Sequence, residues 1–130
     1  LLPNQNKIFK IESKKAVKNI SKFFEFESNF LIDRGDLSKS TGVEKIPVIQ
    51  RKILKEAKKK KNIKISIATN FLESMIVNPY PTRAEVNDIY NAMEMGASNL
   101  VLAGETAVGK YPKECVILLE KIIKTYSRYK

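Results

Sequence analysis

In the stretch NFLIDRGDLSKS, residues 29–40, charged residues directly follow a run of apolar residues. Phe30–Ile32 is typical of a short buried strand, and residues 33–36 (Asp-Arg-Gly-Asp) follow it without a spacer. Packing alone gives a strand no reason to end in three charges around a glycine. Parallel α/β folds, in contrast, bind ligands beyond the carboxyl ends of their strands. We therefore interpret this stretch as a strand that opens into a binding site.

Short runs of the same texture recur along the chain and predict four strands, at Lys7–Ile11, Phe30–Asp33, Ile63–Ala68 and Asn99–Leu102. Between and after them lie segments whose apolar residues share one helical face: Ala16, Val17, Ile20 and Phe24; Ile46, Ile49, Ile53, Leu54 and Ala57; Ala84, Ile89, Ala92 and Met93; and, from about Pro112, Val116, Leu119, Ile122 and Ile123. Strands separated by helices pair in parallel with right-handed crossovers. The sequence thus predicts an α/β fold of four consecutive βα units.

Four βα units make either half of a TIM-type (β/α)₈ barrel or a small open sheet of the flavodoxin type. The shortness of the predicted strands favours the barrel, but periodicity alone leaves both open. Helix boundaries are marked more clearly. Thr82 and Glu85 form a capping box after a proline, Pro47 suits a first helical turn, and Gly96 is typical of a helix end.

Composition limits the classes of protein that the chain can represent. It has 130 residues, enough for one domain, a net charge of +10 and a single cysteine, which points to a reducing, cytoplasmic location. No run of 18 apolar residues predicts a membrane span. The start at Leu1–Pro3, without methionine or a signal-peptide pattern, suggests a fragment. The dense run Lys58–Lys61 lacks interleaved aromatic residues, which favours a solvated helix end over a nucleic-acid surface.

Polar groups follow all four predicted strands, at residues 10–12, 33–36, 68–70 and 103–106, and we expect them to meet at one rim. Glu12 and Asp36 would then be neighbours, and two carboxylates are natural ligands of Mg²⁺. Lys10 alternates with Glu12, so both side chains point to one face of the strand. A lysine there can stabilise negative charge or transfer a proton.

Two other residues of the rim have expected roles. Thr69 offers a hydroxyl from the third strand, and Gly35 would permit tight backbone curvature and a close ligand approach. The alternative for all these charges is a surface network of salt bridges.

At these residues the chain resembles the pyruvate kinase family. The matching segments are KIFKIES, DRGDLS, EKIPVIQRKIL, IATNFLESMIVNPYPTRAEVNDIYNAM and LVLAGETAVGKYPKECV, in the family's order and spacing. The resemblance covers nearly the whole chain, but only strands five to eight of the family's (β/α)₈ barrel. It implies that residues 1–130 form a single partial domain, the C-terminal half of that barrel.

The resemblance also implies an activity and roles for single residues. The family transfers a phosphoryl group from phosphoenolpyruvate to ADP in glycolysis, giving pyruvate and ATP, and it uses Mg²⁺ and usually K⁺. Lys10 matches the lysine that stabilises the transferring phosphoryl group and the enolate. Glu12 and Asp36 match the Mg²⁺ ligands, Gly35 and the Asp36 backbone match the peptide that receives the substrate carboxylate, and Thr69 matches the threonine near the proton-accepting carbon.

Four sites depart from the family pattern. The family usually has a small residue at Asp33, glycine at Ser38, a Gln-Met pair at Asn70-Phe71 and serine at Ala103. A carboxylate at Asp33 would face the substrate carboxylate. At about 5 Å and an effective dielectric of about 20, their repulsion would be about 3 kcal/mol, or about a hundredfold in affinity.

Two further expectations follow from what the 130 residues contain. They lack the family's first half-barrel, which supplies the K⁺ ligands and a phosphate-binding arginine, so this chain alone should be inactive. It should also associate with a copy of itself or with the missing half-barrel, since its two outer strands would be unpaired. The alternatives to a pyruvate-kinase-like phosphotransferase are a catalytically decayed paralogue that binds an anionic metabolite or a protein partner, and a basic nucleic-acid-binding module.

Overall fold

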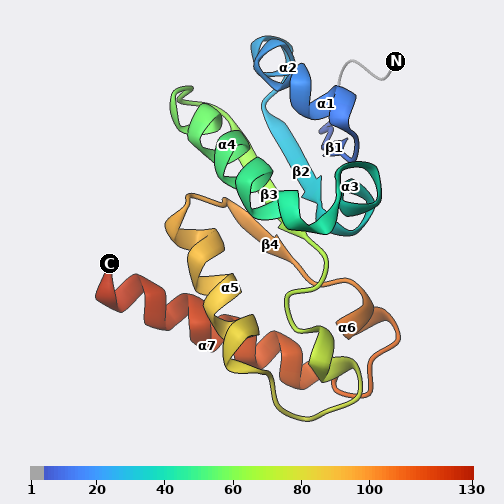
Figure 1. The fold of residues 1–130 in the computed structure, drawn as a ribbon. Helices are drawn as coiled ribbons and strands as arrows, with labels where there is room; N and C mark the ends of the chain where they lie inside the picture. Colours follow the sequence, from blue (N-terminus) through green and yellow to red (C-terminus); the bar gives the residue numbers. More distant parts are fainter. Residues whose placement is uncertain (1–4) are drawn as a thin grey trace.

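The computed structural model describes residues 5–130 and contains a parallel sheet in the order β1-β2-β3-β4 (Figure 1). Its strands are β1 (Phe9–Ile11), β2 (Asn29–Asp33), β3 (Lys64–Ala68) and β4 (Asn99–Val101). All four predicted strands are confirmed, with β1 two residues and β3 and β4 one residue shorter than expected and β2 one residue longer. Residues 1–4 lie outside the described part of the chain, and with them the expectation drawn from Leu1–Pro3.

Helices follow every strand, which confirms the predicted order of four βα units. They are α1 (Lys14–Lys18) and α2 (Ile20–Phe26); α3 (Arg34–Thr41), the 3₁₀ turn η1 (Val43–Lys45) and α4 (Ile46–Lys58); the 3₁₀ turn η2 (Glu73–Ile76) and α5 (Arg83–Glu94); and α6 (Gly104–Ala107) and α7 (Pro112–Tyr129). In the described residues no helix combines the length and the apolar character needed to cross a membrane.

The register of the sheet divides its side chains into two different faces. One face carries Phe30 beside Ile65 and Ile32 beside Ile67, and these four residues belong to the buried core with residues of α2, α4 and α5. Since side chains alternate along a strand, the opposite face carries Lys10 beside Leu31 at the same level as Ser66 and Asn99. In a closed barrel this second, more polar face is the interior.

The capping chemistry expected from the sequence is present. The Thr82 hydroxyl accepts the N–H of Glu85 while the Glu85 carboxylate accepts the N–H of Thr82, so the capping box is complete. Pro47 lies in the first turn of α4. Gly96 follows α5 with a φ of +100°, a backbone conformation that glycine adopts without strain.

Several details of the predicted helical faces are wrong. The first predicted helix is broken at Asn19 into α1 and α2, and Ala84 on α5 is exposed. On α7, Val116 and Ile123 are exposed, whereas Cys115 and Ile122 are the buried residues. The apolar surface of α7 is therefore wider than its buried stripe.

The largest local difference follows β2. We expected a curved loop at residues 33–36, yet α3 begins immediately after the strand, and Asp33 is its N-cap. The signal was present in the sequence, because Asp is a preferred N-cap residue and its side chain bonds the backbone N–H three residues on. Here the Asp33 carboxylate accepts the Asp36 N–H at 3.3 Å.

Candidate active site at the carboxyl ends of the strands

Lys10 lies between two carboxylates. Its ammonium forms an ion pair with Glu12, the residue that directly follows β1, and lies 3.1 Å from Oδ2 of Asp33 at the end of β2. The hydrogen bonds to Glu12 and then to Asp33 hold the pKa of Lys10 well above its ordinary value, so this amine is a fixed positive charge. The alternation that predicted Lys10 and Glu12 on one face is borne out by this contact.

Three carboxylates converge beside that lysine. Glu12, Asp33 and Asp36 each offer an oxygen, and these oxygens lie within 4.8 Å of one another. Asp36 also lies 2.9 Å from the Lys39 ammonium, and this hydrogen bond lowers the pKa of Asp36. Clustered carboxylate oxygens are the donors that Mg²⁺ takes. The three residues could therefore hold a divalent cation. Asp33 is a third carboxylate beside the two predicted ligands; from the sequence we interpreted it only as a residue that repels the substrate.

Thr69 follows β3 in an unusual backbone conformation. Its φ is +75° and that of Asn70 is +57°, a left-handed pair without glycine. The Thr69 hydroxyl accepts the Gly35 N–H at 2.9 Å and donates to the Ala68 carbonyl at 2.5 Å. The structure therefore brings Thr69 to the second strand end, as the sequence predicts.

Gly35 does not provide the tight curvature that we expected. It lies inside α3, and among the described glycines only Gly42 and Gly96 have a positive φ. Its lack of a side chain matters for a different reason. A Cβ atom at Gly35 would lie 3.6 Å from both Asp33 Oδ1 and Thr69 Oγ1, so any longer side chain would enter the site.

The Arg34 side chain binds the backbone of Thr69. Its Nε and Nη2 atoms both donate to the Thr69 carbonyl, at 3.0 and 2.6 Å, while Nη1 lies 2.6 Å from Oδ2 of Asp88 on α5. The guanidinium also stacks over the Phe71 ring, 4.2 Å from its centroid. Sequence reasoning missed this role because the partners of Arg34 lie 35 and 54 residues away.

Glu105, at the fourth strand end, is buried beside the third strand end. It is only 1% exposed, and its carboxylate accepts the backbone N–H groups of Phe71, Leu72 and Ala103 at 2.8–3.1 Å. Burial raises the pKa of Glu105, but these N–H donors outweigh it and the pKa is lowered overall. The fourth strand end does meet the third, because Glu105 and Ala103 line one pocket with Thr69, but the Glu105 charge is buried there and does not lie open on the rim. Glu105 instead ties α6 to the segment after β3.

Together these contacts define a class of protein: a half-barrel of βα units that presents a lysine, a carboxylate cluster and a threonine at the carboxyl ends of its strands. Residues 3–116 match the family described as "Pyruvate kinase, barrel domain", and the chain belongs to this family. Because that domain is a TIM-type barrel, the flavodoxin alternative is set aside.

Curated relatives agree with this assignment. The chain is 44% identical over 117 residues to the pyruvate kinases of Thermotoga maritima and Methanocaldococcus jannaschii, which covers 90% of this chain and 25% and 26% of theirs. It is 38% identical over 128 residues to that of Borreliella burgdorferi, which covers 98% of this chain and 27% of the relative. The chain thus spans about a quarter of the length of the relatives that it matches.

Proposed function

We propose that this chain is the C-terminal half-barrel of a pyruvate kinase and carries its Mg²⁺- and phosphoenolpyruvate-binding residues. The observation that supports this most is the convergence of Lys10, Glu12 and Asp36 at one end of the sheet. The complete enzyme would transfer a phosphoryl group from phosphoenolpyruvate to ADP, giving pyruvate and ATP in the cytoplasm. The family's K⁺ has no ligand assigned in this chain.

In this proposal each residue has one task. Glu12 and Asp36 would hold Mg²⁺, which supplies positive charge to the phosphoryl oxygens when bound. The Lys10 ammonium would stabilise the same oxygens and the enolate, since such transfers depend on positioning and charge neutralisation. The Thr69 hydroxyl lies at the strand end next to Gly35 and would deliver the proton to the enolate carbon.

A second candidate function rests on Asp33. The two N–H groups assigned to the substrate carboxylate are already bonded, that of Gly35 to the Thr69 hydroxyl and that of Asp36 to the Asp33 carboxylate. Asp33 also pairs with Lys10. These contacts favour a diverged paralogue in which an internal carboxylate occupies the place of a substrate carboxylate, and which binds a different anionic metabolite or a protein partner.

Metal binding can be tested on the 130-residue chain itself. We expect Mn²⁺, used as a probe for Mg²⁺, to bind one site, and the Glu12→Gln/Asp36→Asn double variant to lose about tenfold or more in affinity. Glu25→Gln, on the exposed face of α2, is the matched control and should bind normally. Equal Mn²⁺ affinity in both variants would remove the proposed cation site.

Activity must be tested on a polypeptide with a complete barrel. A Mg²⁺-dependent coupled assay with phosphoenolpyruvate and ADP should show turnover there and none in the isolated chain. A folded complete barrel that binds Mn²⁺ but does not turn over would support the paralogue and exclude the kinase.

A further inference from the structure

The backbone that carries the Thr69 hydroxyl is strained. Thr69 has a φ of +75° and Asn70 a φ of +57°, and within residues 5–130 no other residue except glycine has a positive φ. A β-branched residue such as threonine rarely adopts this conformation, because its side chain crowds the backbone. Such a conformation persists only where surrounding contacts impose it, and it is common at functional sites. The contacts that impose it here therefore identify residues that shape the site.

Glu105 binds the segment that directly follows the strained pair. Its Oε1 accepts the N–H groups of Phe71 and Leu72, at 3.1 and 3.0 Å. Its Oε2 accepts the N–H of Ala103, the residue that precedes α6, at 2.8 Å. Because Glu105 is only 1% exposed, its carboxylate has little freedom to move. The backbone after Asn70 is therefore held in a fixed position relative to the end of β4.

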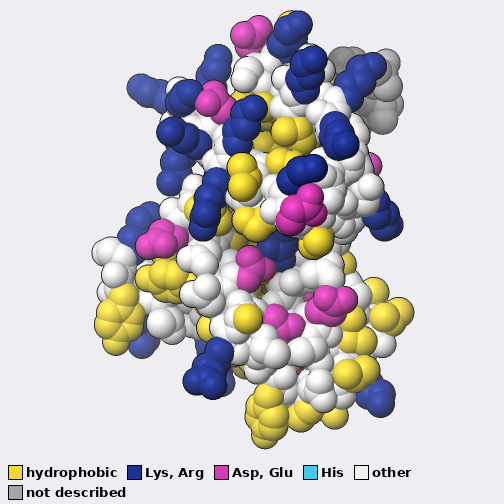
Figure 2. Space-filling model, viewed as in Figure 1, with side chains coloured by type: hydrophobic (Ala, Val, Ile, Leu, Met, Phe, Trp, Pro, Cys, Tyr) yellow, Lys and Arg dark blue, Asp and Glu magenta, His cyan; other side chains and the backbone are white. Residues whose placement is uncertain are grey.

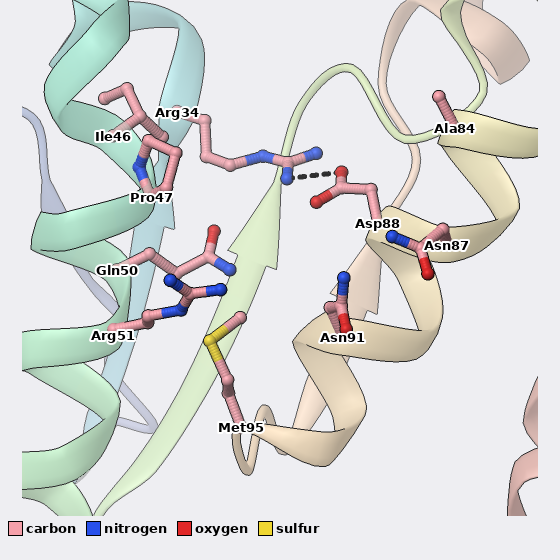
Figure 3. Close-up of a pocket in the computed structure, with 10 residues that line it drawn as sticks. All are labelled: Arg34, Ile46, Pro47, Gln50, Arg51, Ala84, Asn87, Asp88, Asn91 and Met95. Carbon is pink, nitrogen blue, oxygen red and sulfur yellow. Dashed lines mark hydrogen bonds and ion pairs between the residues drawn. The ribbon is translucent and has the colours of Figure 1, made fainter.

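Arg34 holds the other end of the same segment. Its Nε and Nη2 atoms donate to the Thr69 carbonyl at 3.0 and 2.6 Å, and Figure 3 shows its guanidinium reaching Asp88 on α5. The Thr69 hydroxyl in turn accepts the Gly35 N–H at 2.9 Å. The left-handed pair thus lies between a cation at the start of α3 and a buried carboxylate in α6, and these two contacts fix where the hydroxyl points.

We propose that Glu105 is a positioning residue: by binding Phe71 and Leu72 it holds Thr69 in the left-handed conformation that keeps the Thr69 hydroxyl at the second strand end. The conformational part stands by itself, whereas its consequence for catalysis rests on the proposed function, in which that hydroxyl delivers a proton. The three N–H groups need both oxygens of a carboxylate. A glutamine offers one oxygen, and its NH₂ group would face some of these N–H donors.

NMR on the isotope-labelled 130-residue chain tests the conformation directly, since the Thr69 amide-to-Hα coupling and the Cα and Cβ shifts report the sign of φ. We expect left-handed values in the unchanged chain and their loss in Glu105→Gln. Glu85→Gln is the matched control, because it also removes a carboxylate that accepts two backbone N–H groups. This control should leave the Thr69 signals unchanged, whatever stability it loses.

Thr69→Val separates the effect of Glu105 from that of the Thr69 hydroxyl. It removes the hydroxyl with its bonds to Gly35 and Ala68 and keeps the β-branched shape. If Glu105 sets the backbone, residue 69 keeps its positive φ in this variant, and this result decides the inference even if Glu105→Gln does not fold. A positive φ that survives in Glu105→Gln, or that is lost in Thr69→Val, would overturn the inference.

In a complete barrel, Glu105→Gln tests the consequence for catalysis. We expect kcat to fall about a hundredfold, because a reacting group displaced by about 1 Å costs a factor of this order. The KM for phosphoenolpyruvate should change little, since the buried Glu105 acts only through Thr69. An unchanged kcat, or a rise in KM alone, would contradict this consequence. If no complete barrel turns over, the proposed phosphoryl transfer fails, and the NMR result still decides the positioning role.

Discussion

At the scale of single residues, Asp33 decides what the site can accept. One of its carboxylate oxygens accepts the Asp36 N–H and the other lies 3.1 Å from the Lys10 ammonium. In a complete barrel, Asp33→Ala should increase phosphoenolpyruvate affinity, because it frees that N–H and removes a negative charge. Because Lys10 already offsets part of this charge, we expect the affinity to rise about tenfold, less than the roughly hundredfold effect of an unscreened repulsion between the two carboxylates.

Asp33→Asn separates the two effects in the same binding titration. Asparagine caps a helix as well as aspartate does, so this variant removes only the charge and should gain less affinity than Asp33→Ala. Asp33→Ala should also lose about 1 kcal/mol of stability with the cap, measurable by urea unfolding. Unchanged affinity in both variants would show that Asp33 does not oppose the substrate.

Lys10 should compete with a cation for the same carboxylates. Lys10→Met should bind Mn²⁺ several-fold more tightly than the unchanged chain, because a positive charge next to Glu12 and Asp33 is removed. Lys39→Met is the comparison: the Lys39 side chain is 80% exposed and, within residues 5–130, pairs only with Asp36, so solvent screens more of its charge. Calorimetric titration measures both, and weaker binding in Lys10→Met would contradict this account.

At the scale of elements, Arg34 joins the start of α3 to β3 and α5. Arg34→Lys should lower the free energy of unfolding by about 2 kcal/mol, because a lysine cannot bond the Thr69 carbonyl twice, reach Asp88 and stack on Phe71. Urea unfolding measures this loss. Arg83 is exposed at the start of α5, so Arg83→Lys should change stability little. An equal loss of stability in both variants would show that the contacts of Arg34 do not stabilise the fold.

Glu105 links α6 to the segment after β3 and makes stability depend on pH. Because its pKa is lowered in the folded protein, its contribution is fully present above the ordinary value of 4.5 and is lost as the pH falls through the lowered pKa. Glu105→Gln should cost about 3 kcal/mol near neutral pH, since a buried carboxylate with three N–H donors becomes an amide.

The difference between Glu105→Gln and the unchanged chain should shrink as the pH drops below 4.5. Thermal or urea unfolding at several pH values measures that difference. The exposed Glu25→Gln should show no such trend. A gap that stays constant down to low pH would mean that Glu105 does not act through its charge.

What the sequence could predict at this scale was local. The strands, the Thr82 cap and the common face of Lys10 and Glu12 follow from patterns within a few residues, and all are present. Arg34 and Glu105 find partners 33 to 54 residues away, for which no local pattern exists. The left-handed backbone at Thr69 could not be predicted, because no glycine stands there. The helix α3 was missed because the charged residues at its start were interpreted only as ligands.

At the scale of the whole molecule, the net charge and the unpaired sheet edges have opposite effects on association between copies of the chain. Residues 1–64 hold 17 of the 24 Lys and Arg residues but seven of the 14 acids, and Figure 2 shows the basic side chains gathered around α2 and α4. Within residues 5–130, β1 and β4 each pair on one side only. Near β1, Ile8 and Phe9 are 61% and 40% exposed. Unpaired edges favour association between copies, whereas the net charge opposes it.

We therefore expect the isolated chain to self-associate through β1, and to do so more strongly as salt screens the charge of +10 on each copy. Phe9→Lys, which places a charge on the edge strand, should keep the chain monomeric. Phe26→Lys adds the same charge at the end of α2, where Phe26 is 80% exposed and not part of a strand, and should still associate. Sedimentation velocity over a range of concentrations and salt measures this. An unchanged chain that remains monomeric under all conditions, or two variants that behave alike, would show that the open edge does not drive association.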